Sequence, residues 1–183
     1  MRIHKVSWAE AQDALSAIRR TVFIEEQGVP EALEWDGEDA HALHVLVKEG
    51  DAPIGCGRML ADGHIGRMAV LEKHRGRGVG RLIIKTLLME ADRLRKGKVF
   101  LNAQTQAAGF YSKYGFIQVG GAFPDANIPH VRMEKTLDNF SETLNSRFAI
   151  PGQLRFQDSG PGLPVAEITT PDAMARVAVQ GGQ

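Results

Sequence analysis

Near its middle the chain reads Leu71-Glu72-Lys73-His74-Arg75-Gly76-Arg77-Gly78-Val79-Gly80-Arg81. A strand-like run at residues 64–71 leads into this stretch, and apolar residues at helical spacing, from Val79 to Ala91, follow it. A strand, a glycine turn and a helix in this order are typical of anion sites, because the first helical amides are unpaired and glycines let the backbone approach an anion closely. The three arginines of the stretch add positive charge. The stretch therefore predicts a diphosphate site, and the alternative is that its glycines only permit a tight turn.

Two better-known phosphate motifs do not fit the same stretch. A Walker A motif needs Gly-Lys followed by Ser or Thr, which is absent, and the dinucleotide fingerprint places its third glycine one residue later. A different kind of phosphate site is therefore expected.

The elements on either side of the turn predict one mixed domain. Ser7-Trp8-Ala9-Glu10 fits a capping box, so a helix is expected from Ser7 to about Phe23, before the segment Gln27-Gly28-Val29-Pro30 ends it. Short turns at Gly50-Asp51 and Asp62-Gly63 separate three strand-like runs, which predicts an antiparallel meander. The predicted strands are residues 3–6, 42–49, 52–60, 64–71, 98–103, 116–119 and 130–136, and the other predicted helices are residues 79–96 and 107–113. The fold class is therefore α/β (α+β), with a mixed, mostly antiparallel central sheet flanked by helices.

Residues 137–183 are predicted to form an extension beyond a domain of residues 1–136. Apolar residues at helical spacing predict a helix over residues 137–148, and a segment rich in glycine and proline, residues 151–164, predicts a loop. Thr170-Pro171-Asp172 resembles a helix start, so a short helix is expected over residues 173–179. Because the first of these helices must bury its apolar stripe somewhere, it is expected to cover the sheet or a second subunit, which makes a homodimer possible.

Composition excludes several classes of protein. The chain has 183 residues, 43% of them hydrophobic, which suits one globular domain with a sizeable core. No apolar run approaches the roughly 20 residues of a membrane-spanning helix, and no apolar stretch follows the amino terminus. The single cysteine, Cys56, cannot form an internal disulfide. We therefore expect a cytoplasmic protein that has no membrane partner.

Opposite charges are separated along the sequence although 22 basic and 22 acidic residues balance overall. Residues 25–51 hold nine acids and one base, whereas residues 67–98 hold ten bases and three acids. A basic stretch with so few interleaved aromatic residues does not favour a nucleic-acid partner. The two segments could hold a cationic and an anionic ligand, or they could be two solvated faces.

Two motifs in order resemble the GCN5-related N-acetyltransferases. The first is Arg75-x-x-Gly78-x-Gly80 after Met68-Ala69-Val70, which is similar to the acyl-CoA pyrophosphate loop of that family. The second joins Leu101-Asn102-Ala103-Gln104 to the segment Ala107-Ala108-Gly109-Phe110-Tyr111-Ser112-Lys113-Tyr114-Gly115-Phe116. Residues 22–30, Glu34, Asp36, Gln104 and Ile128-Pro129-His130 further resemble the ElaA-like branch. The resemblance covers about residues 1–136.

The resemblance implies an acyltransferase site that uses acetyl-CoA and no metal. It implies that backbone groups of Met68, Ala69 and Val70 hold the pantetheine arm, and that Tyr111 donates a proton to the leaving thiol. It implies a role near the pantetheine for Asn102 and Gln104, and substrate-side roles for Glu26, Asp36 and His130, with Glu26 and His130 as catalytic candidates. The residues implied for the pyrophosphate loop are Arg75, Gly76, Arg77, Gly78, Val79, Gly80 and Arg81. Each of these side chains could instead have a structural role.

The general base is left open by the sequence. An attacking amine must lose a proton, because a lysine-like amine with a pKa of about 10.4 is almost entirely protonated at neutral pH. Four histidines and three carboxylates are candidates, and a water molecule is another; the side chains are His41, His44, His64, His130, Glu26, Glu34 and Asp36. The acidic segment favours a cationic amine, either a small molecule or a protein side chain.

Three functions are compatible with these residues. The first is an N-acetyltransferase that acts on a primary amine, and the second is an acyl-CoA-binding regulator without turnover. The third is an acyl-homoserine-lactone synthase, because residues 19–23, Trp35, Asp36 and Asp39 loosely resemble the amino-terminal half of those enzymes. The loop around Arg75 and the segment around Tyr111 favour the first.

Overall fold

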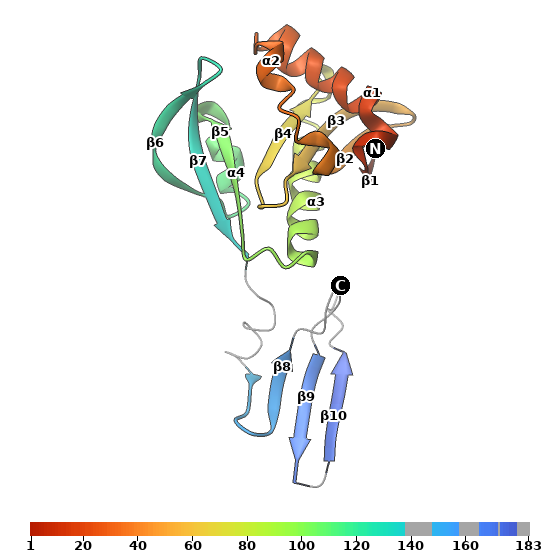
Figure 1. The fold of residues 1–183 in the computed structure, drawn as a ribbon, viewed down its shortest axis with the longest axis vertical. Helices are drawn as coiled ribbons and strands as arrows, with labels where there is room; N and C mark the ends of the chain where they lie inside the picture. Colours follow the sequence, from red (N-terminus) through yellow and green to blue (C-terminus); the bar gives the residue numbers. More distant parts are fainter. Residues whose placement is uncertain (138–147, 158–164, 172, 179–183) are drawn as a thin grey trace. The chain divides into compact units, whose positions relative to one another are not determined.

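The structure is a computed structural model that describes residues 1–137, 148–157, 165–171 and 173–178 (Figure 1). The chain divides into two compact units, the first made of residues 1–91 and 98–135, and the second of residues 92–97 and 136–183. Among the described residues no helix is long and apolar enough to cross a membrane. Every residue of the predicted acyltransferase site belongs to the first unit.

A four-stranded antiparallel sheet, in the order β1-β2-β3-β4, forms half of the first unit. Its strands are β1 (Arg2–Val6), β2 (Leu43–Glu49), β3 (Ala52–Met59) and β4 (Ile65–Val70). The predicted meander is confirmed, with Leu46 opposite Cys56 and Cys56 opposite Ala69. β4 is the edge strand of this sheet, and its outer side is where the site described below begins.

Two helices cover opposite faces of this sheet. The predicted capping box starts α1 (Trp8–Arg19) at Ser7, and a π-helical stretch, η1 (Arg20–Glu26), continues it. Leu15, Ile18 and Val22 of this helical segment pack on one face of the sheet, against a cluster that includes Cys56. On the other face lies α3 (Val79–Arg93), whose buried residues are Val79, Ile83, Ile84, Leu87 and Ala91.

Two glycines of β3 allow α3 to lie close to the sheet. A Cβ atom at Gly55 would be 2.8 Å from Val79 Cγ1, and one at Gly57 would be 2.6 Å from Ile83 Cγ2. No real Cβ contact is that short, so a side chain at either position would push the helix away. The glycines therefore fix the height at which the amino-terminal end of α3 sits above the sheet.

A second sheet of three strands, in the order β5-β7-β6, completes the first unit. It consists of β5 (Lys98–Gln104), β6 (Ile117–Asp125) and β7 (Ile128–Thr136), and between β5 and β6 run η4 (Thr105–Ala107) and α4 (Ala108–Ser112). A single parallel bridge, His64 to Phe100, joins the two sheets. Beyond that bridge β4 and β5 belong to separate sheets, which leaves the outer edge of β4 open.

A bulge interrupts β4 beside this open edge. The pairing with β3 shifts between Cys56 and Arg58, whose partners on β4 are Ala69 and Gly66, so β4 holds one extra residue there. Arg67 lies inside the bulge with φ of 50°. This conformation is uncommon for a residue other than glycine, and it redirects the Arg67 side chain.

The second unit contains an antiparallel sheet where the sequence predicted a loop and a helix. Its strands are β8 (Leu154–Gln157), β9 (Val165–Thr170) and β10 (Ala173–Ala178), in the order β10-β9-β8. The short helix predicted over residues 173–179 is therefore wrong, and so is the loop where β8 lies. β10 pairs along its whole length with β9, which is rich in β-branched residues, and the Arg176 guanidinium reaches the Glu167 carboxylate across the pair at 3.0 Å. The helix predicted over residues 137–148 and its dimer surface lie mostly outside the described residues.

Candidate active site

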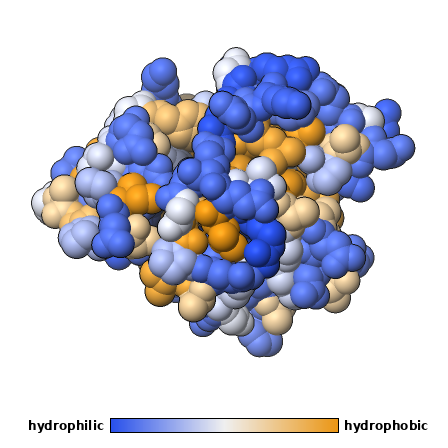
Figure 2. Space-filling view, turned by 90° about the horizontal axis from the view of Figure 1, so that it is seen from above, coloured by the Kyte–Doolittle hydropathy of each residue, from blue (hydrophilic) through white to orange (hydrophobic). Residues whose placement is uncertain are grey.

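A cavity of 230 Å³ opens in the first unit where β4 and β5 part. Its lining includes Met68 of β4, Asn102 and Gln104 of β5, Tyr111 of α4 and His130 of β7. The structure thus brings together five of the residues proposed for the site from sequence. Seen from the end where α2 (Glu31–Glu34) and the β6–β7 hairpin lie, hollows with apolar surface appear between hydrophilic rims (Figure 2).

Tyr111 is held in place by aromatic neighbours and faces β4. Its ring makes edge-on contacts with Phe110 and Phe116, with centroid separations of 5.0 and 6.1 Å. The hydroxyl donates to Met68 Sδ at 3.8 Å. Burial raises the pKa of Tyr111 to about 12, so the phenol keeps its proton near neutral pH and can serve as a donor.

The glycine-rich turn lies on the same side of the unit as Tyr111. Gly76 and Gly78 have positive φ angles of 72° and 85°, which glycine adopts freely, and no atom lies within 4 Å of where their Cβ atoms would be. A Cβ atom at Gly80 would be 3.5 Å from Phe110 Cζ, so the first turn of α3 touches the helix that carries Tyr111. This backbone can accept an anion close to the helix that carries Tyr111.

Two arginines of the turn are paired with carboxylates from distant segments. Arg75 makes a bidentate pair with Glu26 at 2.7 and 2.6 Å, and its Nε donates to the Val70 carbonyl at 3.0 Å. Arg77 contacts Glu49 at 2.6 Å. The hydrogen bonds from Arg75 lower the pKa of Glu26. Glu26 thus lies at the turn and is not among the residues that line the cavity.

Most of the acidic segment is neutralised within the fold. Arg19 is 1% exposed, and it contacts Glu34 at 2.5 Å and Asp39 at 2.7 Å. The Arg19 guanidinium also lies over the rings of Trp8 and Trp35, 5.6 and 4.8 Å from their centroids. Burial raises the pKa of Glu34, against the opposing effect of the arginines around it. Arg19 therefore has a structural role in the core of the first unit.

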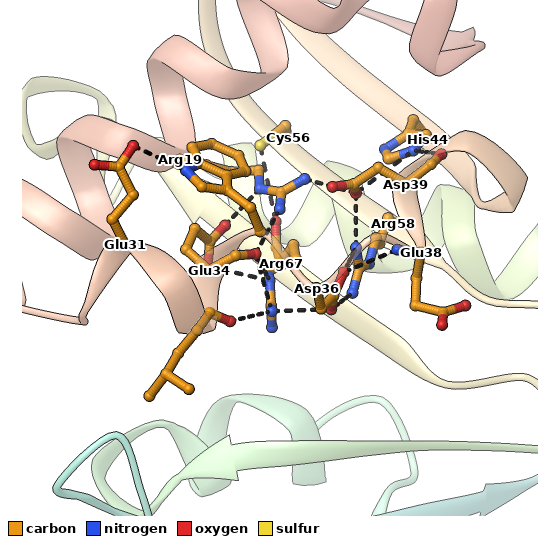
Figure 3. Close-up of polar contacts among 12 residues, drawn as sticks. Arg19, Glu31, Glu34, Asp36, Glu38, Asp39, His44, Cys56, Arg58 and Arg67 are labelled. Carbon is orange, nitrogen blue, oxygen red and sulfur yellow. Dashed lines mark hydrogen bonds and ion pairs between the residues drawn. The ribbon is translucent and has the colours of Figure 1, made fainter.

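Arg58 and Arg67 complete this cluster from β3 and β4 (Figure 3). Arg58 contacts both oxygens of Asp36 and reaches Asp39 at 2.6 Å. Arg67 contacts Asp36 at 3.0 Å and the Glu34 carboxylate at 3.1 Å. Burial would raise the pKa of Asp36, but hydrogen bonds from Arg58 and from the Glu38 amide, together with the nearby positive charges, lower it to about 2. We call these six residues the arginine–carboxylate cluster: Arg19, Glu34, Asp36, Asp39, Arg58 and Arg67.

This cluster changes how the charge pattern of the sequence is interpreted. The acidic segment was expected to favour a cationic amine, yet Glu34, Asp36 and Asp39 are all occupied by arginines. Asp36 is fixed within the cluster and is not among the lining residues of the cavity. Acidic and basic residues that are far apart along the chain are therefore paired with each other in the folded structure.

His130 is the histidine placed best for proton transfer. The β6–β7 turn has positive φ at Ala126 and Asn127, as type I′ hairpins require, and it carries His130 to the cavity. Nδ1 lies 2.8 Å from the Ile128 carbonyl, which can only accept, so Nδ1 holds the proton and Nε2 keeps a lone pair. His44 differs, because it is buried with Nε2 2.9 Å from the Asp39 carbonyl.

Side-chain amides form a short hydrogen-bonded chain that includes Gln27 and Gln104 of the cavity lining. Gln104 Nε2 donates to Gln27 Oε1 at 2.8 Å, and Gln106 Nε2 donates to Gln104 Oε1 at the same distance. Sequence reasoning missed Gln27, Arg58 and Arg67 as lining residues. A signal for Arg67 existed, since the preceding glycine inside a predicted strand often marks a bulge.

Several known proteins resemble this chain. Residues 9–137 match the family described as acetyltransferase (GNAT) domain. An uncharacterized N-acetyltransferase of Bacillus subtilis, YjcF, is 40% identical over 122 residues, which cover 64% of this chain and 87% of the relative. Escherichia coli ElaA is 33% identical over 131 residues, which cover 67% and 85% of the two chains.

Solved structures share the arrangement of the first unit. The crystal structure of Escherichia coli ElaA has a TM-score of 0.68 with 28% identity, over 74% of this chain and 99% of that one. An acyl-CoA N-acyltransferase from Pseudomonas aeruginosa has a TM-score of 0.67 with 28% identity, over the same shares of the two chains.

Proposed function

The chain belongs to the GNAT acetyltransferases, and on that premise we propose that it moves an acetyl group from acetyl-CoA to a primary amine. The predicted ElaA-like branch and fold class are confirmed by the same similarities. The observation that carries the proposal is the position of Tyr111 on a cavity beside the open edge of β4, with the start of α3 against its helix.

The described residues suit the diphosphate and the pantetheine arm of acetyl-CoA. The amides around Gly76 and Gly78 would hold the diphosphate, since open space surrounds both glycines. Arg81 is exposed and has no ion pair within the described part of the chain, so it is available for a phosphate. The free edge of β4 at Met68 would pair with the amides of the pantetheine arm as an added strand would.

Two side chains would handle the protons. Acetyl-CoA would supply the acetyl group as a thioester. His130 Nε2 would accept the proton of the amine, directly or through a water molecule, and the Tyr111 hydroxyl would donate its proton to the departing sulfur. We assign the base to His130 and not to Glu26, because Glu26 is paired with Arg75 outside the lining of the cavity.

Calorimetry with coenzyme A and a thiol-release assay test the proposal together. We expect the full chain to bind coenzyme A and to release free thiol from acetyl-CoA faster with at least one primary amine than without. Binding with no amine-dependent release would favour a regulator that binds acyl-CoA without turnover. Failure to bind coenzyme A would refute both functions.

A further inference from the structure

Arg67 presents an unused donor to the cavity. Its Nε and Nη2 atoms are fixed by the Leu33 and Glu34 carbonyls at 3.1 to 3.3 Å and by the carboxylates of Glu34 and Asp36. Nη1 has no acceptor within the described residues, and Arg67 lines the cavity. In Figure 3 the end of this side chain extends from the cluster toward the strands of the second sheet.

A second guanidinium on the same wall is also incompletely paired. Arg58 lines the cavity with its side chain 3% exposed, and its Nε has no acceptor although it is buried. Buried donors are almost always paired in folded proteins, so this enclosed N–H group calls for a partner that the described residues do not supply, such as a buried water molecule. Arg58 and Arg67 thus both line the cavity, and each has one N–H group without an acceptor among the described residues.

The carboxylates of the cluster do not prevent an anionic ligand from binding to the arginines on this wall. Three arginines face three carboxylates, so the cluster is neutral and does not repel an anion. Besides Arg58, Arg67 and Glu34, which contacts Arg67, the charged and histidine side chains that line the cavity are His64 beside β4 and, from the β6–β7 hairpin, Asp125 and His130. The cavity therefore offers anion donors on one wall, and on the hairpin a carboxylate together with the lone pair of His130 Nε2.

These two walls match a ligand that carries both an amine and an anion. Building on the proposed function, we propose that the acceptor amine also bears a carboxylate, as free amino acids do, and that Arg67 Nη1 binds that carboxylate. A guanidinium donor to a carboxylate makes a strong, charge-assisted hydrogen bond.

Matched pairs of amines test this inference on the unaltered protein. Alanine and ethylamine, and phenylalanine and phenethylamine, differ by one carboxylate. In any pair that the protein acetylates, we expect kcat/KM to be at least tenfold higher for the amino acid than for its decarboxylated amine. Equal or higher values for the decarboxylated amines would overturn the inference and leave the proposed function standing.

Variants of Arg67 test whether this side chain causes the preference for amines that carry a carboxylate. Arg67→Met should raise the KM for the amino acid and bring the ratio within each pair close to one, without a change in the KM for acetyl-CoA, and Arg67→Lys should restore part of the ratio. Arg132→Met is the control, because Arg132 lies over Phe100 and is not among the lining residues. An unchanged ratio in a folded Arg67→Met protein would contradict the assignment.

A binding experiment keeps the inference separate from turnover. If no amine is acetylated, the proposed function fails. Calorimetry of the protein saturated with coenzyme A, using N-acetylalanine and N-ethylacetamide, then decides the inference. Tighter binding of the carboxylate compound supports it, and equal binding or none overturns it.

Discussion

At the scale of single residues, Tyr111 combines burial with access to the cavity. Burial raises its pKa to about 12, so the phenol carries its proton at neutral pH and has one to donate when a thiolate forms. Met68 Sδ, a weak acceptor, is the partner of its hydroxyl, which leaves the proton easily redirected.

Tyr111→Phe should lower kcat by about 10²- to 10⁴-fold, because general acid catalysis contributes that much. Tyr114→Phe is the matched control, since Tyr114 follows the same short helix and is not among the residues that line the cavity. Steady-state thiol release with each variant measures the difference. Equal activity of the two variants would exclude Tyr111 as the acid.

His130→Asn should slow transfer most at low pH. The Nε2 lone pair would be lost, so transfer would depend on the fraction of amine that is already neutral, which grows as pH approaches about 10.4 for a lysine-like amine. The ratio of wild-type to variant kcat/KM, followed from pH 7 to pH 9.5, should therefore fall. A ratio that does not depend on pH would indicate that His130 only shapes the cavity.

At the scale of elements, the glycine-rich turn is linked to η1 before any ligand arrives. Arg75 is paired with Glu26 at the end of η1, and Arg77 with Glu49 at the end of β2. A diphosphate that recruits these arginines must compete with both carboxylates. The ion pairs thus set part of the affinity for an anion at the turn.

Glu26→Gln should tighten binding of coenzyme A by up to about fivefold, because an exposed ion pair contributes about 0.2–1 kcal/mol. Glu31→Gln is the control, since Glu31 pairs with Arg20 away from the turn. Calorimetry at low salt measures both. Weaker binding by Glu26→Gln would mean that the carboxylate supports the loop and does not compete with the ligand.

Local patterns predicted most elements of the first unit and failed in the second. The capping box at Ser7 starts α1 where expected, and the apolar period of α3 matches its buried face. Residues 173–178, Ala-Met-Ala-Arg-Val-Ala, include good helix formers, yet pairing with β9 imposes a strand. Pairing between two strands depends on tertiary contacts, which local propensity does not predict.

The candidate site was predictable only where its residues form motifs. Tyr111 and the turn around Gly78 belong to contiguous patterns, so the sequence located them. Arg19, Arg58 and Arg67 pair with carboxylates 15 to 33 positions away, and no spacing along the chain predicts such pairs. For this reason the sequence did not show that Glu34, Asp36 and Asp39 of the acidic segment are paired with arginines.

At the scale of the whole molecule, the arginine–carboxylate cluster ties the first unit together. It links α1, α2 and the segment around Asp39 to β3 and β4. Removing one partner from such a cluster leaves a buried charge without compensation, which costs far more than the intact pair contributes.

Arg19→Met should lower the free energy of unfolding by about 3–5 kcal/mol, because Glu34 and Asp39 would lose a buried partner. Arg20→Met, at the next position, should change it little, since the pair of Arg20 with Glu31 is exposed. Urea unfolding measures both variants. Similar losses would show that the cluster contributes no more than a surface pair.

Asp36 should make the protein lose stability in acid. Its pKa is about 2 in the folded chain and 3.8 as a reference, so its contribution is present above pH 4 and is lost as the pH falls toward 2. The difference corresponds to about 2 kcal/mol. Asp36→Asn should therefore lose less free energy of unfolding than wild type between pH 4 and pH 2, measured by urea titration. A parallel loss in both proteins would assign acid sensitivity to other groups.

The burial of Cys56 has a practical consequence for enzymology. It is the single cysteine of the chain, it is 1% exposed, and burial raises its pKa to about 12. Disulfide dyes react with thiolate, and this sulfur is both protonated and out of reach. A chromogenic disulfide added to the native protein will therefore count only coenzyme that has been set free. If the detected thiol later rises by one equivalent per chain, that rise will measure the molecules that have unfolded and exposed Cys56.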